Sequence, residues 1–225
     1  MVSNGLVVSM LSDIVTQRRL ERIEEIVAQR TRYLTIVLED IYQSQNASAV
    51  LRTCECFGVQ DVHIVENYNM YSVNPLVVQG ADKWLTLHRH NQSDNNTVVA
   101  INRLKADGYR IIATLPGEES VDLYQFDVAR GKFAVVFGNE HKGVSGCVRD
   151  LADESMSVPM CGFTQSLNIS VSAAVVIAEL TRKMKNEVEE WQMPEEEKIS
   201  IKTEWLKRSV KNPHMLINRL LEESK

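Results

Sequence analysis

Short apolar runs alternate along this chain with longer segments that carry the pattern of amphipathic helices. Several of the runs, such as "FAVVF" at residues 133–137, contain no polar residue, which is typical of strands buried on both faces. Because consecutive parallel strands need a long crossover connection, usually a helix, this alternation predicts an α/β fold with a mostly parallel sheet and helices on both faces. We expect the strands at residues 34–39, 61–66, 84–90, 109–115, 132–138 and 155–160.

The two ends of the chain have helical patterns and no strand pattern. Residues 13–30 form an amphipathic stretch for which Ser12 is the expected N-cap. Residues 191–200 have the composition of a surface linker, and two short helices are expected after them, at 201–212 and 214–225. We therefore predict an N-terminal helical extension (1–32), an α/β domain (33–190) and a C-terminal helical extension (191–225).

Length and composition allow one large core and argue against a membrane protein. The chain has 225 residues, 44% of them apolar, and can bury a sizeable core. No apolar run approaches the roughly 18 residues of a membrane span. The first residues lack the basic start and the cleavage site of a signal peptide. We therefore expect a cytoplasmic protein with no membrane partner and with its cysteines reduced.

The histidines and cysteines do not predict a metal site. His88 and His90 alternate on an expected strand and would point to the same face. No third ligand stands near them, and the four cysteines lack the spacing of a zinc site. We expect no bound metal.

The common phosphate-binding and nucleophile motifs are missing from the sequence. No G-x-G-x-x-G follows an expected strand, and no G-x-S-x-G is present. The stretch "GNEHKGVS" (138–145) has two glycines at the spacing of a phosphate-binding loop, but Val144 stands where that loop requires lysine. The sequence therefore argues against dinucleotide-binding, P-loop and α/β-hydrolase enzymes.

Three polar clusters lie where strands or turns lead into helices. They are Asn46 with Arg52, Gly138 to Glu140 with Gly143, and Thr164 to Asn168 before the apolar helix "ISVSAAVVIAEL". Ligands of open α/β sheets bind at the carboxyl ends of the strands, where all three clusters would lie. Each cluster also has a structural explanation, such as a helix cap or a surface ion pair. Asn46 and Arg52 can face one ligand only if Asn46 caps the helix and Arg52 reaches back.

The sequences around these clusters resemble the three motifs of the SpoU family of RNA 2′-O-ribose methyltransferases, in the same order. The matching stretches are "NASAVLRTCECFGV", "FAVVFGNEHKGVS" and "VPMCGFTQSLNISVSAAVV". The resemblance spans roughly residues 34–180, and the third motif is highly specific. The length of the flanking helices makes the chain most similar to the branch that methylates a tRNA guanosine.

The resemblance implies a SPOUT fold whose C-terminal part is a deep trefoil knot, with S-adenosyl-L-methionine bound in the knotted loops. Matched motif by motif, the cofactor-binding residues, which act largely through backbone, would be Thr114, Leu115, Gly138, Val158, Met160 and Leu167. The implied catalytic set is Arg52, Asn46, Glu140, Ser166 and Asn168. Arg52 would activate the ribose 2′-hydroxyl or, since a guanidinium is a poor base, hold a phosphate and orient that hydroxyl.

The flanks are the expected RNA-binding parts of the chain. The net charge of −5 argues against indiscriminate nucleic-acid binding, and the acidic excess falls between residues 33 and 180. The basic residues of the flanks cluster at helical spacing, as Arg18, Arg19 and Arg22 and as Lys207, Arg208 and Lys211. The resemblance implies that these clusters contact tRNA and not DNA, although the glutamates beside the first one also fit a solvated, ion-paired face. The resemblance further implies a homodimer, with the helix from Asn168 to about Lys183 as its interface.

The function that follows is methyl transfer from S-adenosylmethionine to the 2′-hydroxyl of a tRNA D-loop guanosine, guanosine-18. Methylation of ribosomal RNA or of another tRNA position stays open, because the flanks would select the substrate and the resemblance is weakest there. A non-catalytic RNA-binding or assembly protein and a small-molecule methyltransferase are the alternatives from other classes. The complete set of Asn46, Arg52, Glu140, Ser166 and Asn168 argues against a protein that only binds RNA.

Overall fold

The computed structural model describes residues 3–117 and 119–223. The chain divides into two compact units, Thr31–Trp191 and a second unit made of Met1–Arg30 together with Gln192–Lys225. The first and last segments of the chain therefore belong to one unit, and the whole α/β unit lies between them in the sequence.

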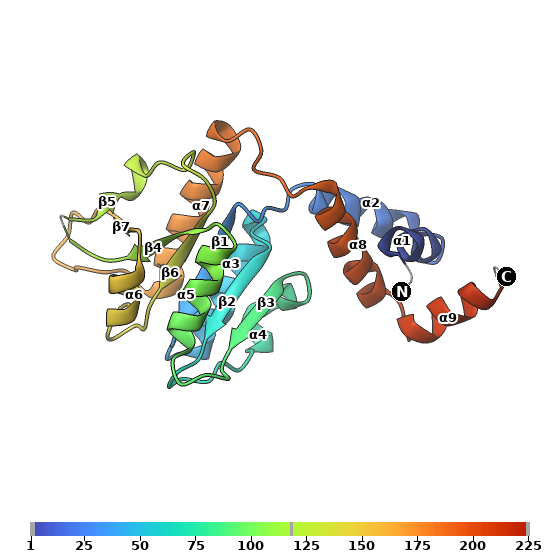
Figure 1. The fold of residues 1–225 in the computed structure, drawn as a ribbon, viewed down its shortest axis with the longest axis horizontal. Coiled ribbons are helices and arrows are strands. Elements are labelled where there is room, and N and C mark those ends of the chain that lie inside the picture. Colours follow the sequence, from blue (N-terminus) through green and yellow to red (C-terminus); the bar gives the residue numbers. More distant parts are fainter. Residues whose placement is uncertain (1–2, 118, 224–225) are drawn as a thin grey trace. The chain divides into compact units, whose positions relative to one another are not determined.

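A single sheet organises the α/β unit (Figure 1). Within the described residues its seven strands follow the order β3-β2-β1-β6-β4-β7-β5, and every pairing is parallel. The strands are β1 (Leu34–Glu39), β2 (Asp61–Val65), β3 (Thr86–His90), β4 (Arg110–Thr114), β5 (Val121–Asp122), β6 (Phe133–Phe137) and β7 (Glu154–Ser157). The predicted parallel sheet is confirmed, and β5 is a short edge strand that the sequence did not suggest.

Helices cover both faces of this sheet, as predicted. The helices of the unit are α3 (Ser44–Phe57), α4 (Pro75–Val78), α5 (Asn96–Ala106), α6 (Gly146–Leu151) and α7 (Ile169–Glu187), with 3-10 turns at Ala81–Lys83 and Leu123–Gln125. Alternate residues of β1 enter different cores: Ile36 packs with α3 and α7, and Val37 packs with α5 and α6. A strand with apolar side chains on both faces can be stable only in such a three-layer arrangement.

One face of β2 and β3 carries a buried polar cluster instead of aliphatic side chains. Asp61 accepts a hydrogen bond from Arg32 Nε at 2.6 Å, and its other oxygen lies 2.9 Å from His88 Nε2. The His63 ring stacks on His88 with centroids 4.5 Å apart, and its Nδ1 lies 3.0 Å from His90 Nε2. Among the described residues, no group of three or more His, Cys, Asp and Glu is placed to hold a metal ion.

The helical unit begins differently from the prediction. The helix expected at 13–30 is present as α2 (Gln17–Val27), but Ser12 is not its N-cap: Ser12 is the last residue of an additional helix, α1 (Asn4–Ser12). The Thr16 hydroxyl accepts a hydrogen bond from the Arg19 amide and is the N-cap of α2. The sequence pattern did not predict α1, in which Val7 and Leu11 are buried.

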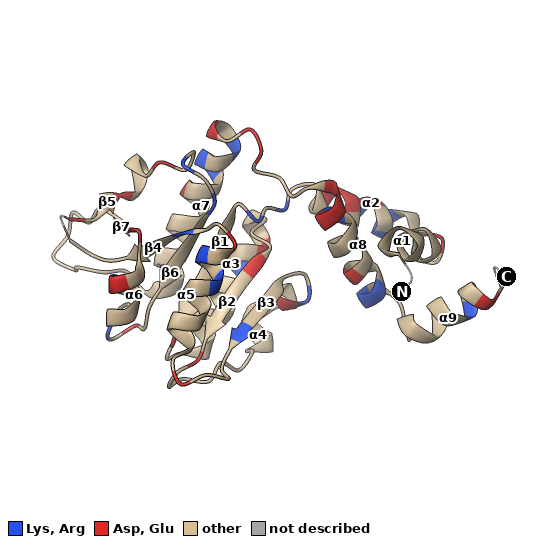
Figure 2. Ribbon diagram, viewed as in Figure 1, with Lys and Arg blue, Asp and Glu red and all other residues tan. Residues whose placement is uncertain are grey.

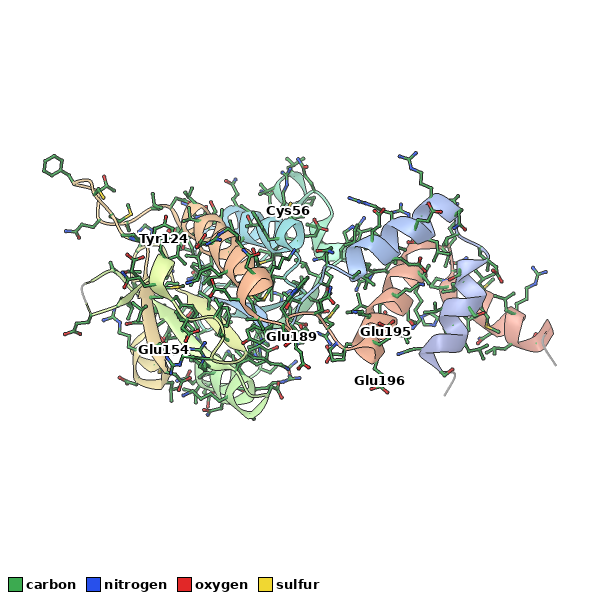
Figure 3. The ribbon with its side chains drawn as sticks, turned by 90° about the horizontal axis from the view of Figure 1, so that it is seen from above. Cys56, Tyr124, Glu154, Glu189, Glu195 and Glu196 are labelled. Carbon is green, nitrogen blue, oxygen red and sulfur yellow. The ribbon has the colours of Figure 1, made fainter. Side chains whose placement is uncertain are left out.

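The linker expected at 191–200 is also wrong, because α8 (Glu195–Ser209) begins within it. Three glutamates, Glu195 to Glu197, occupy its first turn, and Lys207 and Arg208 occupy its last (Figure 2; Figure 3 labels Glu195 and Glu196). This charge distribution complements the helix dipole, so the acidic run starts a helix and is not a solvated connection. The last helix, α9, spans Pro213–Glu223, and the expected helix residues 224 and 225 lie outside the described residues. In the described parts of the chain no helix is long and apolar enough to cross a membrane.

Candidate active site

A cavity of about 420 Å³ opens at the carboxyl ends of β4, β6 and β7. All six residues predicted to bind the cofactor line it: Thr114, Leu115, Gly138, Val158, Met160 and Leu167. Three of the predicted catalytic residues, Glu140, Ser166 and Asn168, line the same cavity. Parallel strands bring their carboxyl ends to one edge, so residues from the end of β4 and from the second and third motifs meet there.

The turn after β6 forms one wall of the cavity and depends on glycine. Asn139 and Gly143 exchange two backbone hydrogen bonds, of 3.0 and 2.8 Å, which close the turn. A Cβ on Gly138 would lie 2.2 Å from the Gly143 carbonyl carbon and 2.2 Å from the Val144 amide nitrogen. Gly143 has a φ of +68°, which side chains disfavour. Only a glycine at position 138 allows the two strands of this turn to approach so closely.

A line of polar side chains joins the three motifs at the mouth of the cavity. The Asn168 amide donates to Asn46 Oδ1 at 3.3 Å, and the Asn46 amide donates to Glu140 Oε1 at 2.8 Å. Asn168 Oδ1 also accepts from the Ser170 amide at 2.8 Å and is the N-cap of α7. Asn168, the last of the polar residues ahead of the most apolar helix, therefore caps that helix and also connects it to α3.

Glu140 holds the beginning of α3 from the neighbouring loop. Its carboxylate accepts hydrogen bonds from the Tyr42 amide at 2.8 Å, the Gln43 amide at 3.1 Å and Asn46. Burial alone would raise the pKa of Glu140, but the hydrogen bonds from Asn46, Tyr42 and Gln43 outweigh it and lower that pKa. The carboxylate is therefore a weak base whose lone pairs are engaged with α3.

Arg52 does not lie at the cavity in the single chain. Asn46 is not the N-cap of α3, since Gln43 takes that position and Asn46 lies inside the helix. Arg52 is exposed on α3, absent from the cavity wall, and no described residue forms an ion pair with its guanidinium. The condition that would bring Asn46 and Arg52 to one ligand is therefore not met, and Arg52 is available to a partner from solution.

Asp40 is a positioning residue at this edge that the sequence did not single out. It follows β1 with a φ of 49°, and its Oδ1 accepts hydrogen bonds from the backbone amides of Asn67, Tyr68 and Asn69. Its carbonyl accepts a hydrogen bond of 2.8 Å from the Asn139 side chain. Asp40 thereby ties the loop after β2 to the glycine turn after β6.

The basic clusters of the flanks lie in the helical unit. Arg18, Arg19 and Arg22 are exposed on α2, where Arg22 also pairs with Glu25 at 3.0 Å. Arg208 and Lys211 are exposed near the end of α8, whereas Lys207 is half-buried and pairs with Glu204 at 2.8 Å. Intrahelical pairs of this kind are weak and exchange readily with other anions.

Comparisons with known proteins agree with the arrangement of the three motifs. The model of the SpoU rRNA methylase family matches residues 33–178. The tRNA (guanosine(18)-2′-O)-methyltransferase of Borreliella burgdorferi is 39% identical over 211 residues, which cover 94% of each chain. The enzyme of the same name from Thermus thermophilus is 36% identical over 168 residues, covering 75% of this chain and 84% of the relative.

A solved structure supports the same assignment. The structure of the Aquifex aeolicus TrmH/SpoU tRNA modifying enzyme superposes with a TM-score of 0.76 at 29% identity, covering 86% of this chain and 98% of that one. A family match over most of the α/β unit, a relative of similar length and a shared fold lead to one conclusion. The chain belongs to the SpoU methylase family.

Proposed function

We propose that this protein transfers a methyl group from S-adenosyl-L-methionine to the 2′-hydroxyl of guanosine-18 in the D-loop of tRNA. The observation that carries the proposal is the line Asn168–Asn46–Glu140, which joins the three motifs beside the cavity. The names of the relatives from Borreliella burgdorferi and Thermus thermophilus support the choice of guanosine-18.

The cavity suits a cofactor of this size and chemistry. Its volume of about 420 Å³ lies within the ~300–1,000 Å³ of typical small-molecule sites. Leu115, Val158 and Leu167 offer apolar contacts, and the turn at Gly138 brings backbone close to the cavity. Bound S-adenosyl-L-methionine would supply a methyl group made electrophilic by the positive charge on sulfur.

The protein's own contribution is positioning. The reaction forms a bond from the ribose 2′-oxygen to the methyl carbon, breaks the carbon–sulfur bond and releases the hydroxyl proton. Placing the oxygen in line with the methyl group provides much of the acceleration in a displacement of this kind. Asn168 and Ser166 lie on the cavity wall where they can orient the ribose, and Glu140 fixes Asn46 behind them.

The proton is proposed to leave to a phosphate oxygen or to water. Glu140 is a weak base because three hydrogen bonds occupy its carboxylate, and an arginine cannot accept a proton near neutral pH. Arg52 would instead bind an RNA phosphate and orient the hydroxyl, a role that fits its exposure on α3.

We further propose a homodimer and the trefoil knot implied by the family. Exposed apolar side chains between β7 and the first turns of α7 support an interface with a second copy there: Met160, Phe163, Leu167 and Val171. The flanking clusters Arg18, Arg19 and Arg22 and Lys207, Arg208 and Lys211 would bind tRNA phosphates, in the cytoplasm, and not DNA.

The test is methyl transfer from labelled S-adenosylmethionine to unmodified tRNA and ribosomal RNA transcripts, followed by mapping of the modified ribose. A single 2′-O-methylguanosine at position 18 of tRNA is the expected product. Label found only in ribosomal RNA would agree with the proposed methyl transfer but would show that tRNA is not the substrate. If Arg52→Ala abolishes methyl transfer and leaves RNA binding unchanged, the alternative that this protein only binds RNA is contradicted.

A further inference from the structure

Two exposed aromatic side chains meet beside the cavity mouth. Tyr42, in the loop before α3, is 60% exposed, and His141, in the turn after β6, is also exposed and lines the cavity. Their ring centroids lie 5.5 Å apart at an interplanar angle of 65°. An edge-to-face pair of this kind leaves ring faces open to a third flat group.

The backbone under both rings is fixed by residues of the glycine turn. The Tyr42 amide donates to Glu140 Oε2 at 2.8 Å, and the His141 amide donates to Asn139 Oδ1 at 2.9 Å. Asn139 itself is held to the Asp40 carbonyl. The backbone that carries both rings therefore belongs to the same hydrogen-bonded framework as Asn46 and Glu140.

Positive charge accompanies the aromatic pair. Lys142, the neighbour of His141, and Arg149 both line the cavity and are exposed. Open aromatic faces beside cationic side chains are the combination by which proteins bind unpaired nucleotides: bases stack on the rings, and phosphates contact the cations.

We infer that Tyr42 and His141 bind the base of the nucleotide whose ribose is methylated, held out of its RNA stack. This inference rests on the proposed function and adds a base-binding platform to it. A base is bonded directly to its own ribose, so a base stacked at the rim leaves that ribose at the cavity opening, beside Ser166 and Asn168. Stacking of this kind accepts any base, so the platform positions the nucleotide and leaves the choice of guanosine to other contacts.

The test uses a tRNA transcript with 2-aminopurine in place of the target guanosine, together with methyl-transfer kinetics on the unlabelled transcript. Stacking quenches the fluorescence of 2-aminopurine. We expect wild-type protein to quench the probe, and Tyr42→Ala and His141→Ala to lose most of the quenching. Both variants should raise the KM for tRNA roughly 5- to 100-fold, while the Kd for S-adenosylmethionine stays unchanged. Tyr42→Phe restores an aromatic face and should recover most of the quenching.

Tyr124→Ala is the matched control, because Tyr124 is 56% exposed in the same unit but does not line the cavity (Figure 3). Alanine variants that quench the probe and bind tRNA like wild type would overturn the inference and leave the methyltransferase assignment intact. Alanine variants that lose S-adenosylmethionine binding together with thermal stability would show a structural role and also overturn it. Wild-type protein that methylates no RNA would overturn the assignment itself, and the base-binding role with it.

Discussion

Glu140 shows how one side chain acts on the candidate site through the backbone that it holds. It supplies the hydrogen-bond acceptors for the amides of Tyr42 and of the N-cap residue Gln43, and the N-cap amide is the one that the first-turn glutamate of a capping box usually satisfies. Gln43 itself makes no side-chain capping bond. A carboxylate at a helix N-terminus also interacts favourably with the helix dipole. Glu140, which the family resemblance assigns to the catalytic set, is therefore also an anchor for the beginning of α3.

Replacing Glu140 with glutamine should destabilise the protein in a pH-dependent way. The amide group turns a donor toward the Tyr42 or Gln43 amide, and the expected cost near neutral pH is about 1–2 kcal/mol. The pKa of Glu140 is lowered in the folded state, so its stabilising contribution is present above 4.5 and is lost as the pH falls through the folded value. Urea unfolding should therefore show a wild-type advantage at pH 7 that shrinks below pH 4.5.

Glu189→Gln provides the control, because Glu189 is exposed and lies outside the cavity wall (Figure 3). It should leave the free energy of unfolding nearly unchanged at both pH values. An equal pH dependence in Glu140→Gln and wild type would contradict the capping role.

His63 should make the whole protein sensitive to acid. Burial, together with His88 and His90, lowers the pKa of His63 from 6.5 to about 3. Between pH 6.5 and about 3, His63 therefore binds a proton in the unfolded chain but not in the folded one. The free energy of unfolding consequently falls as the pH drops from 6.5 toward 3. At pH 5 this single group should cost about 2 kcal/mol relative to neutral pH.

The measurement is the free energy of unfolding of wild type and His63→Gln between pH 7 and pH 4. The variant should lose part of the slope across this range even if it is less stable overall. Ile64→Val, one residue along β2 on its other face, should lower stability by a similar amount at every pH. A variant slope equal to that of wild type would show that other groups govern the acid response.

The turn between β6 and α6 is the element on which the cavity depends most directly. Gly138→Ala places a methyl group against the backbone of Gly143 and Val144, atoms that cannot move without opening the turn. We expect a loss of about 3 kcal/mol or more in stability, or a displaced turn that no longer binds S-adenosylmethionine. Calorimetric titration with the cofactor and thermal unfolding together distinguish the two outcomes.

Gly146→Ala is the comparison variant for this element. An added Cβ at Gly146 meets nothing within 4 Å, and the residue begins α6. Alanine there should be neutral or slightly stabilising, because it favours the helix. Normal cofactor binding by Gly138→Ala would show that the close approach is not needed for the cavity.

At the level of elements, the sequence predicts what depends on local pattern and misses what depends on distant partners. The apolar run of β6 and the mixed run of β1 identify buried strands without any tertiary information. The start of α8 was missed because three consecutive glutamates have the composition of a linker, and only their position in the first turn makes them helix-stabilising. Asp40 could not have been predicted, since its partners stand 27 to 29 residues away and, with Asn139, 99 residues away.

The residues of the candidate site also fall into those that the sequence could identify and those that only the folded structure places. Motif resemblance identified the residues that line the cavity, because each motif follows a strand end and strand ends converge. It could not place Arg52, because the orientation of a side chain on α3 depends on where the helix begins, and α3 begins at Ser44 and not at Asn46. The Tyr42–His141 pair escaped notice because Tyr42 precedes the first motif, His141 belongs to the second, and the two residues touch only in the folded chain.

For the molecule as a whole, the division of charge predicts how RNA affinity responds to salt. The α/β unit carries the acidic excess, so affinity should come from the exposed cluster of Arg18, Arg19 and Arg22. Reversing all three to glutamate should weaken tRNA binding strongly and flatten the plot of log affinity against log salt by roughly 2. The Kd for S-adenosylmethionine should not change, because α2 belongs to the other compact unit.

Changing Glu195, Glu196 and Glu197 to glutamine is the matched control in the same unit (Figure 3). It alters the net charge by three without removing a cation, and it should leave tRNA affinity unchanged or higher. Equal affinities of the arginine variant and wild type, measured by filter binding at several salt concentrations, would remove α2 from the RNA-binding surface.

The composition of the helical unit from both ends of the chain has a consequence for synthesis on the ribosome. The helices α1 and α2 are made first, yet Leu11 and Val27 belong to a unit that is completed only by α8 and α9. The α/β unit is continuous in sequence and can fold while the last helices are still being made. For that interval the N-terminal helices emerge with their apolar faces uncovered. A ribosome-bound chain in which the residues up to Trp191 have left the exit tunnel, while the residues after it are still inside, should display a folded α/β unit preceded by a segment that chaperones and proteases can reach.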